Sequence, residues 1–349
     1  MVKKNTTILV LLGLLVAAGF FGAISWLILS LMGGIAEKKS IEPAVPPLSS
    51  DFALTTVERL NDVKNVPQGL FNYGGSTSWV PIQAAVNPFL QILFPQFILR
   101  YTNPVNGKPG SGTGIKMLLE NQLSFALSSR PLIAAEYQQA KNQGFNFEEI
   151  PVAIDAIAIA VHPTLNIPGL TISQLKDIYT GKIINWSQVG GPDLPITPYS
   201  RLEKDSGTVE FFVQNILERE AFTNNLVLVS DTSTGLQKLS KNPGGIYYAS
   251  APEIVPQCGV KALPIGQKLG EWKTPYQEPF IPLSHCPAKR NQVNNKLIKS
   301  GEYPITRRLF VIVKGDKSID EQAGRAYANL LLTKEGQELI NKSGFVSLR

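Results

Sequence analysis

Histidine and concentrated positive charge are what this sequence has least of. Its 349 residues include two histidines, His162 and His285, so a histidine-based metal centre is not indicated. Lys and Arg are scattered, with no basic run beyond pairs such as Lys3-Lys4 and Arg307-Arg308. Nucleic-acid binding usually needs a concentrated basic face, and the sequence does not predict it.

Two catalytic or nucleotide signatures are also missing. The glycine-rich stretch at 110–114 is not followed by the Gly-Lys-Ser/Thr ending of a nucleotide phosphate loop. Ser206 does not sit in a Gly-x-Ser-x-Gly elbow and has no histidine near it in the sequence. A hydrolase with Ser206 as nucleophile is therefore kept only as a third hypothesis, and the sequence favours a protein that is not an enzyme and needs no cofactor.

The two cysteines, Cys258 and Cys286, leave two interpretations open. In an oxidising compartment they would form one disulfide, which closes a loop of about 28 residues and stabilises by ~3 kcal/mol on a chain-entropy estimate. The other interpretation is a pair of buried free thiols. Their spacing shows no metal motif.

One long apolar run is present, at the N-terminus. Residues 8–35 are apolar except for Ser25 and Ser30, which is longer than the ~30 Å bilayer core requires. We therefore predict a membrane anchor over residues 1–36, an N-terminal transmembrane helix with the body of the protein outside the cytoplasmic membrane. Ala36 lies at a small-residue cleavage candidate, so a secreted periplasmic protein with a cleaved signal is the alternative.

Beyond the anchor, the composition is that of a globular protein. The chain is 44% hydrophobic and 17% charged, and its length suggests two domains plus extra segments. Residues 37–65 contain several prolines and no sustained periodicity, so we predict a linker there and a folded part that starts near Val66. The mild net charge of +6 suits a protein that handles anions or lies near anionic lipid.

Strands and helices alternate through the folded part, which predicts an α/β fold with a mostly parallel sheet. Two apolar runs, at 154–161 and 309–313, are typical of buried strands. We interpret them as paired crossover strands that join two lobes. The predicted lobe I comprises 66–161 and 305–349, and the predicted lobe II comprises 162–304.

Three turns rich in Gly, Ser and Thr each precede a segment with helical spacing, at residues 74–79, 110–114 and 201–212. Free backbone N–H groups at a helix N-terminus attract anions, and glycine lets a ligand approach the backbone closely. In the third turn, Ser206 is a candidate helix cap and Arg201 a charged clamp. The sequence therefore predicts an oxyanion site with two turns from one lobe and one from the other.

The order and spacing of these motifs resemble a known family over roughly residues 68–349. The matching segments are Gly75-Ser76-Thr77-Ser78, Gly110-Ser111-Gly112-Thr113-Gly114, Ser128-Ser129-Arg130-Pro131, 175–186, Arg201 with Ser206-Gly207-Thr208, 303–309 and 333–337. The chain looks like the phosphate-binding solute receptors of ABC-type phosphate transporters, which belong to the type 2 periplasmic-binding-protein superfamily.

The resemblance implies a two-lobed receptor that closes about a hinge and passes phosphate to a membrane permease. The implied phosphate-binding residues are Ser76, Thr77, Ser78, Ser111, Ser129, Arg130, Arg201, Ser206, Gly207 and Thr208. An alternative role for Arg130 is pairing with an acidic residue. A second hypothesis from another class is a membrane-anchored oxyanion sensor or scavenging module without handoff to a transporter.

The sequence departs from the family at one position. Many members carry an aspartate in the Ser-Asp-x-Pro segment, where it accepts the proton of monohydrogen phosphate and repels sulfate. Here Ser129 occupies that position, and a hydroxyl carries no charge. Selectivity for phosphate over sulfate would then depend on another acidic group, such as Asp155 or Asp205.

Overall fold

The computed structural model describes residues 57–202 and 206–348. The chain divides into two units, Met1–Glu42 and Pro43–Arg349, and every described residue belongs to the second. The predicted anchor and residues 37–56 of the predicted linker therefore lie outside the described residues. Within the described part, no helix combines the length and apolarity needed to cross a bilayer.

Lobe I is built on three parallel strands, β1 (Gly69–Gly75), β2 (Phe97–Tyr101) and β3 (Phe125–Ser128), in the order β2-β1-β3. α2 (Val80–Leu93) buries Ile82, Val86 and Leu90, whose spacing of four residues keeps them on one helix face. The lobe also contains η1 (Leu60–Asp62), η2 (Thr77–Trp79), α3 (Ser111–Leu119), α4 (Ala134–Asn142), α10 (Ile319–Leu332) and α11 (Lys334–Lys342).

The folded part of lobe I begins ahead of the predicted start at Val66. Leu60 is fully buried in the lobe I core, and its backbone N–H donates to Glu335 of α11. The backbones of Val57 and Glu58 accept hydrogen bonds from residues 334 and 335. The predicted linker is therefore too long at its C-terminal end, because these contacts come from the far end of the chain and leave no periodic signal.

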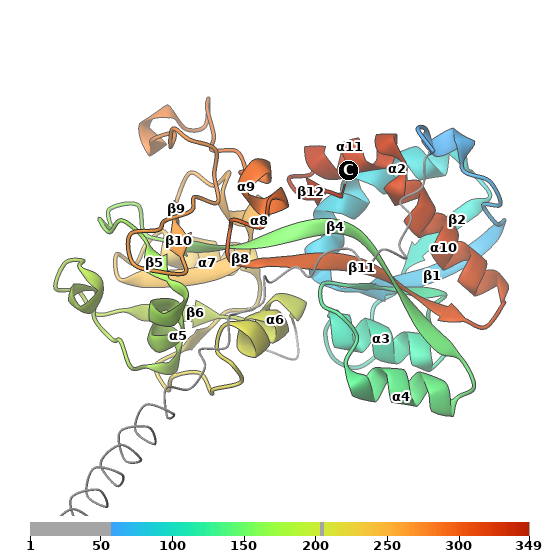
Figure 1. Ribbon diagram of the computed structural model, residues 1–349, viewed down its shortest axis with the longest axis horizontal. Coiled ribbons are helices and arrows are strands. Elements are labelled where there is room, and N and C mark those ends of the chain that lie inside the picture. The colour runs from blue at the N-terminus through green and yellow to red at the C-terminus, as the bar shows by residue number, and fades with distance from the viewer. Residues whose placement is uncertain (1–56, 203–205, 349) are drawn as a thin grey trace, which may run out of the picture. The chain divides into compact units, whose positions relative to one another are not determined.

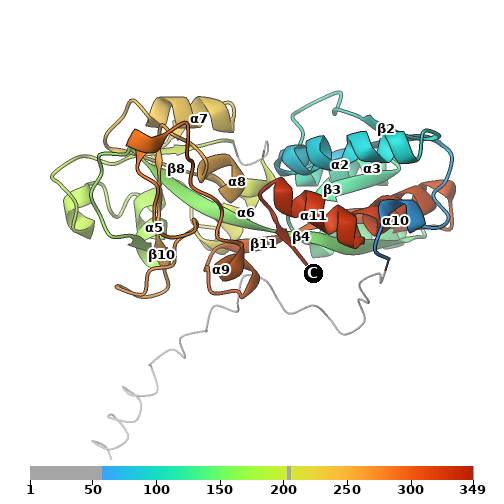
Figure 2. The same cartoon turned by 90° about the horizontal axis from the view of Figure 1, so that it is seen from above.

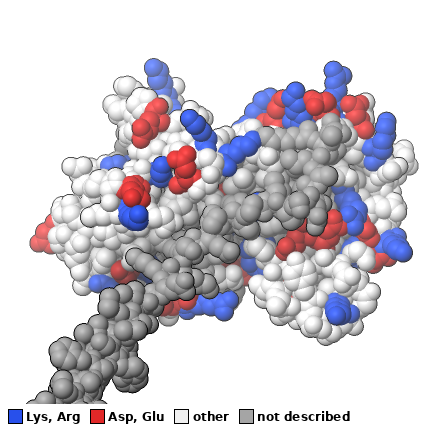
Figure 3. Space-filling model, viewed as in Figure 1, with Lys and Arg blue, Asp and Glu red and all other residues white. Residues whose placement is uncertain are grey.

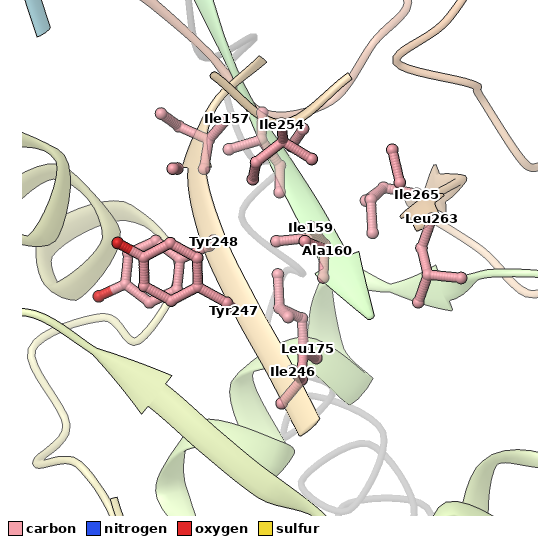
Figure 4. Close-up of a cluster of buried hydrophobic side chains, with 14 of the residues drawn as sticks. Ile157, Ile159, Ala160, Leu175, Ile246, Tyr247, Tyr248, Ile254, Leu263 and Ile265 are labelled. Carbon is pink, nitrogen blue, oxygen red and sulfur yellow. The ribbon is translucent and has the colours of Figure 1, made fainter. Parts of the chain in front are cut away.

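Lobe II is built on β6 (Thr197–Ser200), β7 (Val227–Leu228) and β8 (Gly245–Ser250), which pair in parallel in the order β8-β6-β7. Tyr247 and Tyr248 of β8 lie near Ile254 of the following helix and near Ile157 and Ile159 (Figure 4). The remaining elements are β5 (Leu170–Thr171), α5 (Ile172–Thr180), η3 (Trp186–Val189), α6 (Gly207–Asn215), α7 (Thr232–Leu239), α8 (Ala251–Ile254), β9 (Lys261–Leu263), β10 (Ile265–Gly266), η5 (Leu283–His285) and α9 (Asn295–Lys299).

Two long strands run through both lobes, β4 (Asn146–Val161) and β11 (Thr306–Gly315). They cross between the two groups of elements in Figure 1 and pair with each other antiparallel. The first half of β4 pairs with β11 beside the lobe I sheet, and its last residues pair with β8 and β9 of lobe II. The two crossover strands predicted from the apolar runs are present in the structure.

The prediction of a mostly parallel sheet is wrong for the centre of the molecule. The outer strands of each lobe are parallel, but β11 is antiparallel to β3 and to β4, and β4 is antiparallel to β8. The short β12 (Val346–Ser347) also pairs antiparallel with β4. Connecting strands that leave one lobe and return to it must run in opposite directions, so the two-lobed architecture produces a mixed sheet.

The disulfide predicted as one of two interpretations is present. Cys258 and Cys286 are bonded, with their Cα atoms 5.8 Å apart. The bond closes a loop that contains β9, β10 and η5. An isolated antiparallel bridge between Tyr276 and Val293 joins this loop to the chain that follows Cys286.

Candidate functional site

The first Gly/Ser/Thr turn follows β1 and leads through η2 into α2. Gly75 has a φ of +123°, and a Cβ there would lie 2.3 Å from the backbone oxygen of Leu127. The side chain of Ser76 caps η2 by accepting from the backbone N–H of Ser78 at 3.3 Å. Ser76 and Ser78 are buried, and Thr77 is partly buried between them. This is the strand–turn–helix order predicted from the sequence.

The second turn places Ser111 at the first position of α3. Ser111 is fully buried, and Gly114 in the same helix lies so close to Gly75 that a Cβ would be 2.5 Å from the Cα of Gly75. The glycines therefore let the first two turns pack directly against each other.

Three hydroxyls from lobe I form one cluster. Ser76 Oγ donates to Ser129 Oγ at 2.9 Å, and Ser129 Oγ lies 3.2 Å from Ser111 Oγ. The backbone N–H of Ser129 donates to Ser111 Oγ at 3.1 Å. Segments that are far apart in the sequence are thus joined because β1 and β3 are neighbours in the sheet and α3 packs beside them.

The third turn brings the N-terminus of α6 from lobe II onto this cluster. Ser206 caps the helix by accepting from the backbone N–H of Val209. A Cβ on Gly207 would lie 2.4 Å from Ser111 Oγ and 2.5 Å from Ser129 Oγ. Thr208 Oγ1 lies 3.2 Å from Ser78 Oγ of lobe I. The first turn of α6 therefore packs against the lobe I hydroxyls of Ser78, Ser111 and Ser129.

Arg201 and Arg130 have different surroundings. Nη1 of Arg201, from lobe II, donates to Thr77 Oγ1 of lobe I at 3.5 Å. Arg130 donates to Glu136 of α4 at 2.8 Å and to Glu210 of α6 at 3.0 Å. Burial lowers the pKa of Arg130, but these carboxylates outweigh it and raise the pKa above its ordinary value. This geometry favours the alternative role of Arg130 as an ion-pair partner over direct phosphate binding.

Sequence reasoning missed Arg307, which lies at the centre of the site. Its side chain is 1% exposed and pairs with Asp155 at 2.8 Å. Nη2 donates to Ser78 Oγ at 2.9 Å and to Thr208 Oγ1 at 2.8 Å, and Nη1 donates to the carbonyl of Gly207 at 3.1 Å. One available signal was an arginine just before an apolar strand run, where a charge is costly to bury unless it is paired.

Asp155, a candidate acceptor for a phosphate proton, is instead engaged by two residues of the protein. It accepts two bonds from Arg307 and one from the hydroxyl of Ser250. Complete burial raises the pKa of Asp155, and Arg307 and Ser250 oppose that rise. Asp205 lies outside the described residues.

Two cavities flank the N-terminus of α6. One, of about 360 Å³, is lined in part by Thr77, Ser78, Arg201, Ser206 and Thr208. Its lining also includes further residues of lobe II, among them Asp231, Thr232, Ser233, Tyr247, Tyr248 and Glu253. The other cavity, of about 330 Å³, is lined by Ser111, Ser206 and Gly207 together with Gly110, Lys116 and Glu210. Ser206 borders both.

The pKa values of the two acidic residues of the larger cavity are shifted in opposite directions. Hydrogen bonds from Ser230 and from Thr234 lower the pKa of Asp231, which caps α7. Burial raises the pKa of Glu253, against the hydrogen bond from Thr232. Asp231 is therefore a charged cap committed to its own helix, and Glu253 is the more easily protonated carboxyl in the cavity wall.

Hydrogen-bond donors dominate this arrangement. Hydroxyls, the backbone N–H groups at the start of α6 and the guanidinium of Arg201 converge from both lobes, as an anion with several acceptor oxygens requires. The described residues contain no group of three or more His, Cys, Asp or Glu side chains suited to a metal ion. On the face shown in Figure 3, positive and negative side chains are interspersed.

Most of the residues predicted for the site lie together. Thr77, Ser78, Arg201, Ser206 and Thr208 line the larger cavity, and Ser111 and Gly207 line the smaller. Ser76 and Ser129 line neither cavity. Both are buried in the hydroxyl cluster that they form with Ser111.

A two-lobed α/β molecule whose lobes are joined by crossed strands and carry facing donors has the architecture of a periplasmic-binding-protein-like receptor. The comparison with protein families agrees: the chain belongs to the PBP superfamily, whose domain matches residues 74–335.

Curated relatives cover most of the chain at low identity. SphX of Synechococcus elongatus is 26% identical over 80% of this chain and 78% of its own length. The phosphate-binding protein PstS of Borreliella burgdorferi is 26% identical over 85% of this chain and 97% of its own length. PstS of Staphylococcus epidermidis RP62A is 27% identical over 69% of each chain.

Solved structures have the same fold. A phosphate ABC transporter substrate-binding protein from Clostridium perfringens, solved with bound phosphate, aligns with a TM-score of 0.63 and 24% identity, over 80% of this chain and all of its own. An ABC-type phosphate transport receptor from Vibrio cholerae aligns with a TM-score of 0.59 and 24% identity, over 79% of this chain and 99% of its own.

Proposed function

We propose that this protein is an extracytoplasmic receptor for inorganic phosphate that delivers its ligand to an ABC-type permease. The observation that carries the proposal is the convergence of two lobe I turns and the capped N-terminus of α6 with Arg201. The relatives named PstS, which bind phosphate, support the choice of oxyanion. In this role the protein is a receptor and not an enzyme.

The proposed ligand set consists of residues that lie where the two lobe I turns meet the N-terminus of α6. Thr77, Ser78 and Ser111 would donate from lobe I, with Ser76 and Ser129 behind them in the hydroxyl cluster. Arg201, Ser206, Gly207 and Thr208 would donate from lobe II. Arg130 is left out of the set because Glu136 and Glu210 engage its guanidinium.

The proposal includes attachment to the membrane through the apolar N-terminal run. Residues 8–35 are long enough to span a bilayer, and a disulfide is typical of proteins outside the cytoplasm. Cell fractionation after carbonate extraction tests this part by itself: an anchored protein stays with the membrane, and a protein that has lost the segment is released.

Isothermal titration of the purified full chain with phosphate tests the main proposal, with sulfate as the comparison. We expect saturable binding of one phosphate per chain. A chain that gives no binding signal with phosphate or any other tetrahedral oxyanion contradicts the proposed function.

A further inference from the structure

Arg307 forms hydrogen bonds with residues of both lobes. It lies on β11, opposite Asp155 in the register of β4 and β11. From this connecting strand, one guanidinium reaches Ser78 of lobe I and both Gly207 and Thr208 of lobe II. These are the residues that carry the proposed oxyanion site.

The chemistry of the guanidinium fixes the direction of these hydrogen bonds. Arginine carries only donors, so Ser78 Oγ and Thr208 Oγ1 both accept, and they share the one N–H of Nη2 that does not point at Asp155. A hydroxyl that accepts through a lone pair still has its own proton to donate. Ser78 and Thr208 are 3.2 Å apart, and only one of them can donate to the other. The remaining hydroxyl proton is available to the cavity that both residues line.

We propose that Arg307 is a positioning residue, which orients the hydroxyl pair of Ser78 and Thr208 so that the pair presents a proton, and not a lone pair, to an oxyanion. Without Arg307, each hydroxyl could rotate and turn a lone pair toward the ligand. A fully ionised oxyanion oxygen accepts hydrogen bonds and is repelled by such a lone pair.

The pair with Asp155 keeps the guanidinium in place. Nε and Nη2 of Arg307 both donate to Oδ2 of Asp155, at 2.9 and 2.8 Å, and the hydroxyl of Ser250 holds the other carboxylate oxygen. The charge of Arg307 is thereby balanced inside the protein. Its effect on a ligand is therefore through the two hydroxyls, whereas Arg201 lines the cavity directly.

The inference rests on the proposed function, and a double-mutant cycle separates the two. We would replace the ion pair by neutral groups of similar shape, Asp155→Asn with Arg307→Gln, because removing only one partner leaves a buried charge. The same replacement is made in a Thr208→Val background, which lacks one of the two hydroxyls. Phosphate affinity is measured by titration for all four proteins, and thermal unfolding without ligand reports whether each one folds.

If Arg307 acts through the hydroxyls, neutralising the pair weakens phosphate binding at least tenfold when Thr208 is present and clearly less in the Thr208→Val background. Equal losses in both backgrounds mean that the pair only braces the connecting strands, and overturn the inference. Absence of phosphate binding by the unmodified protein overturns the proposed function as well, and is seen before any variant is made.

Arg308→Gln is the matched control, since it makes the same arginine-to-glutamine change at the next position of β11, where side chains point to the opposite face. We expect its phosphate affinity to stay within twofold, and a tenfold loss would mean that any such substitution in this strand weakens binding. Arg307→Lys covers the case in which the neutral pair does not fold. It keeps the charge, but one ammonium cannot span both hydroxyls and the Gly207 carbonyl. Its affinity should fall, and an unchanged affinity contradicts the inference.

Discussion

Three arginines of the site have three different tasks, set by their surroundings. Arg130 is held by two carboxylates, Arg307 pairs with Asp155 inside the connecting strands, and Arg201 lines the larger cavity. An arginine engaged by carboxylates offers an anion little net charge. Arg201 is therefore the cationic side chain that we expect to contact the oxyanion directly.

Replacement of Arg201 by alanine tests this assignment. Loss of a charge-assisted hydrogen bond from a partly desolvated site should weaken phosphate binding by about 2 kcal/mol or more, or roughly 30-fold in the dissociation constant. Titration calorimetry measures the change. Lys241→Ala, at an exposed position of the same lobe, serves as the control and should bind as the unmodified protein does. Wild-type affinity in Arg201→Ala would contradict the assignment.

At the scale of elements, the disulfide segment is separate from the site. The bond between Cys258 and Cys286 closes a loop over a sequence separation of 28 residues, and neither cysteine lines either cavity. The segment therefore contributes to the stability of lobe II and is not part of the oxyanion site.

Substituting both cysteines by serine should separate stability from binding. On a chain-entropy estimate, loss of a crosslink of this length costs about 3 kcal/mol of unfolding free energy. We expect a lower denaturation midpoint together with an unchanged phosphate affinity at a temperature where the variant is folded. Chemical denaturation and calorimetry on the same preparation measure the two quantities. A variant that unfolds normally but binds weakly would show that the segment supports the site.

At the scale of the whole described body, the site exists only when the two lobes meet. Ser78 and Thr208, Thr77 and Arg201, and Arg130 and Glu210 each join lobe I to lobe II. β4 and β11 are the long strands shared by the lobes, and in the second view they again pass between the helices of one lobe and those of the other (Figure 2). Ligand binding should accordingly be coupled to approach of the lobes.

Gly207→Ala should interfere with that approach. The added methyl group would lie 2.4 to 2.5 Å from two buried hydroxyl oxygens of lobe I, closer than real contacts allow. We expect phosphate affinity to fall at least tenfold and the decrease in radius of gyration on adding phosphate, measured by small-angle X-ray scattering, to be reduced.

The control for this variant is Gly259→Ala, where an added methyl group meets only Ser240 at 3.3 Å. Its phosphate affinity and scattering response should match those of the unmodified protein. Unchanged binding in Gly207→Ala would mean that α6 does not close against lobe I as tightly as the structure has it.

Much of the fold could be predicted from the sequence because its signals are local. The apolar runs at 154–161 and 309–313 identified the connecting strands, and Gly/Ser/Thr turns before periodic segments identified helix starts near Ser76, Ser111 and Ser206. Strand direction was partly mispredicted, since pairing between distant strands is decided by the path of the chain through both lobes.

The sequence by itself determined which groups could face an anion: hydroxyls, helix N-termini and Arg201. Only the tertiary structure decided how the other charges are used. It paired Arg130 with Glu136 and Glu210, and it placed Arg307 between Ser78 and Thr208. The reason is physical: the cost of a buried charge is settled by whichever partner folding brings within hydrogen-bond distance, and these partners are far away in the sequence.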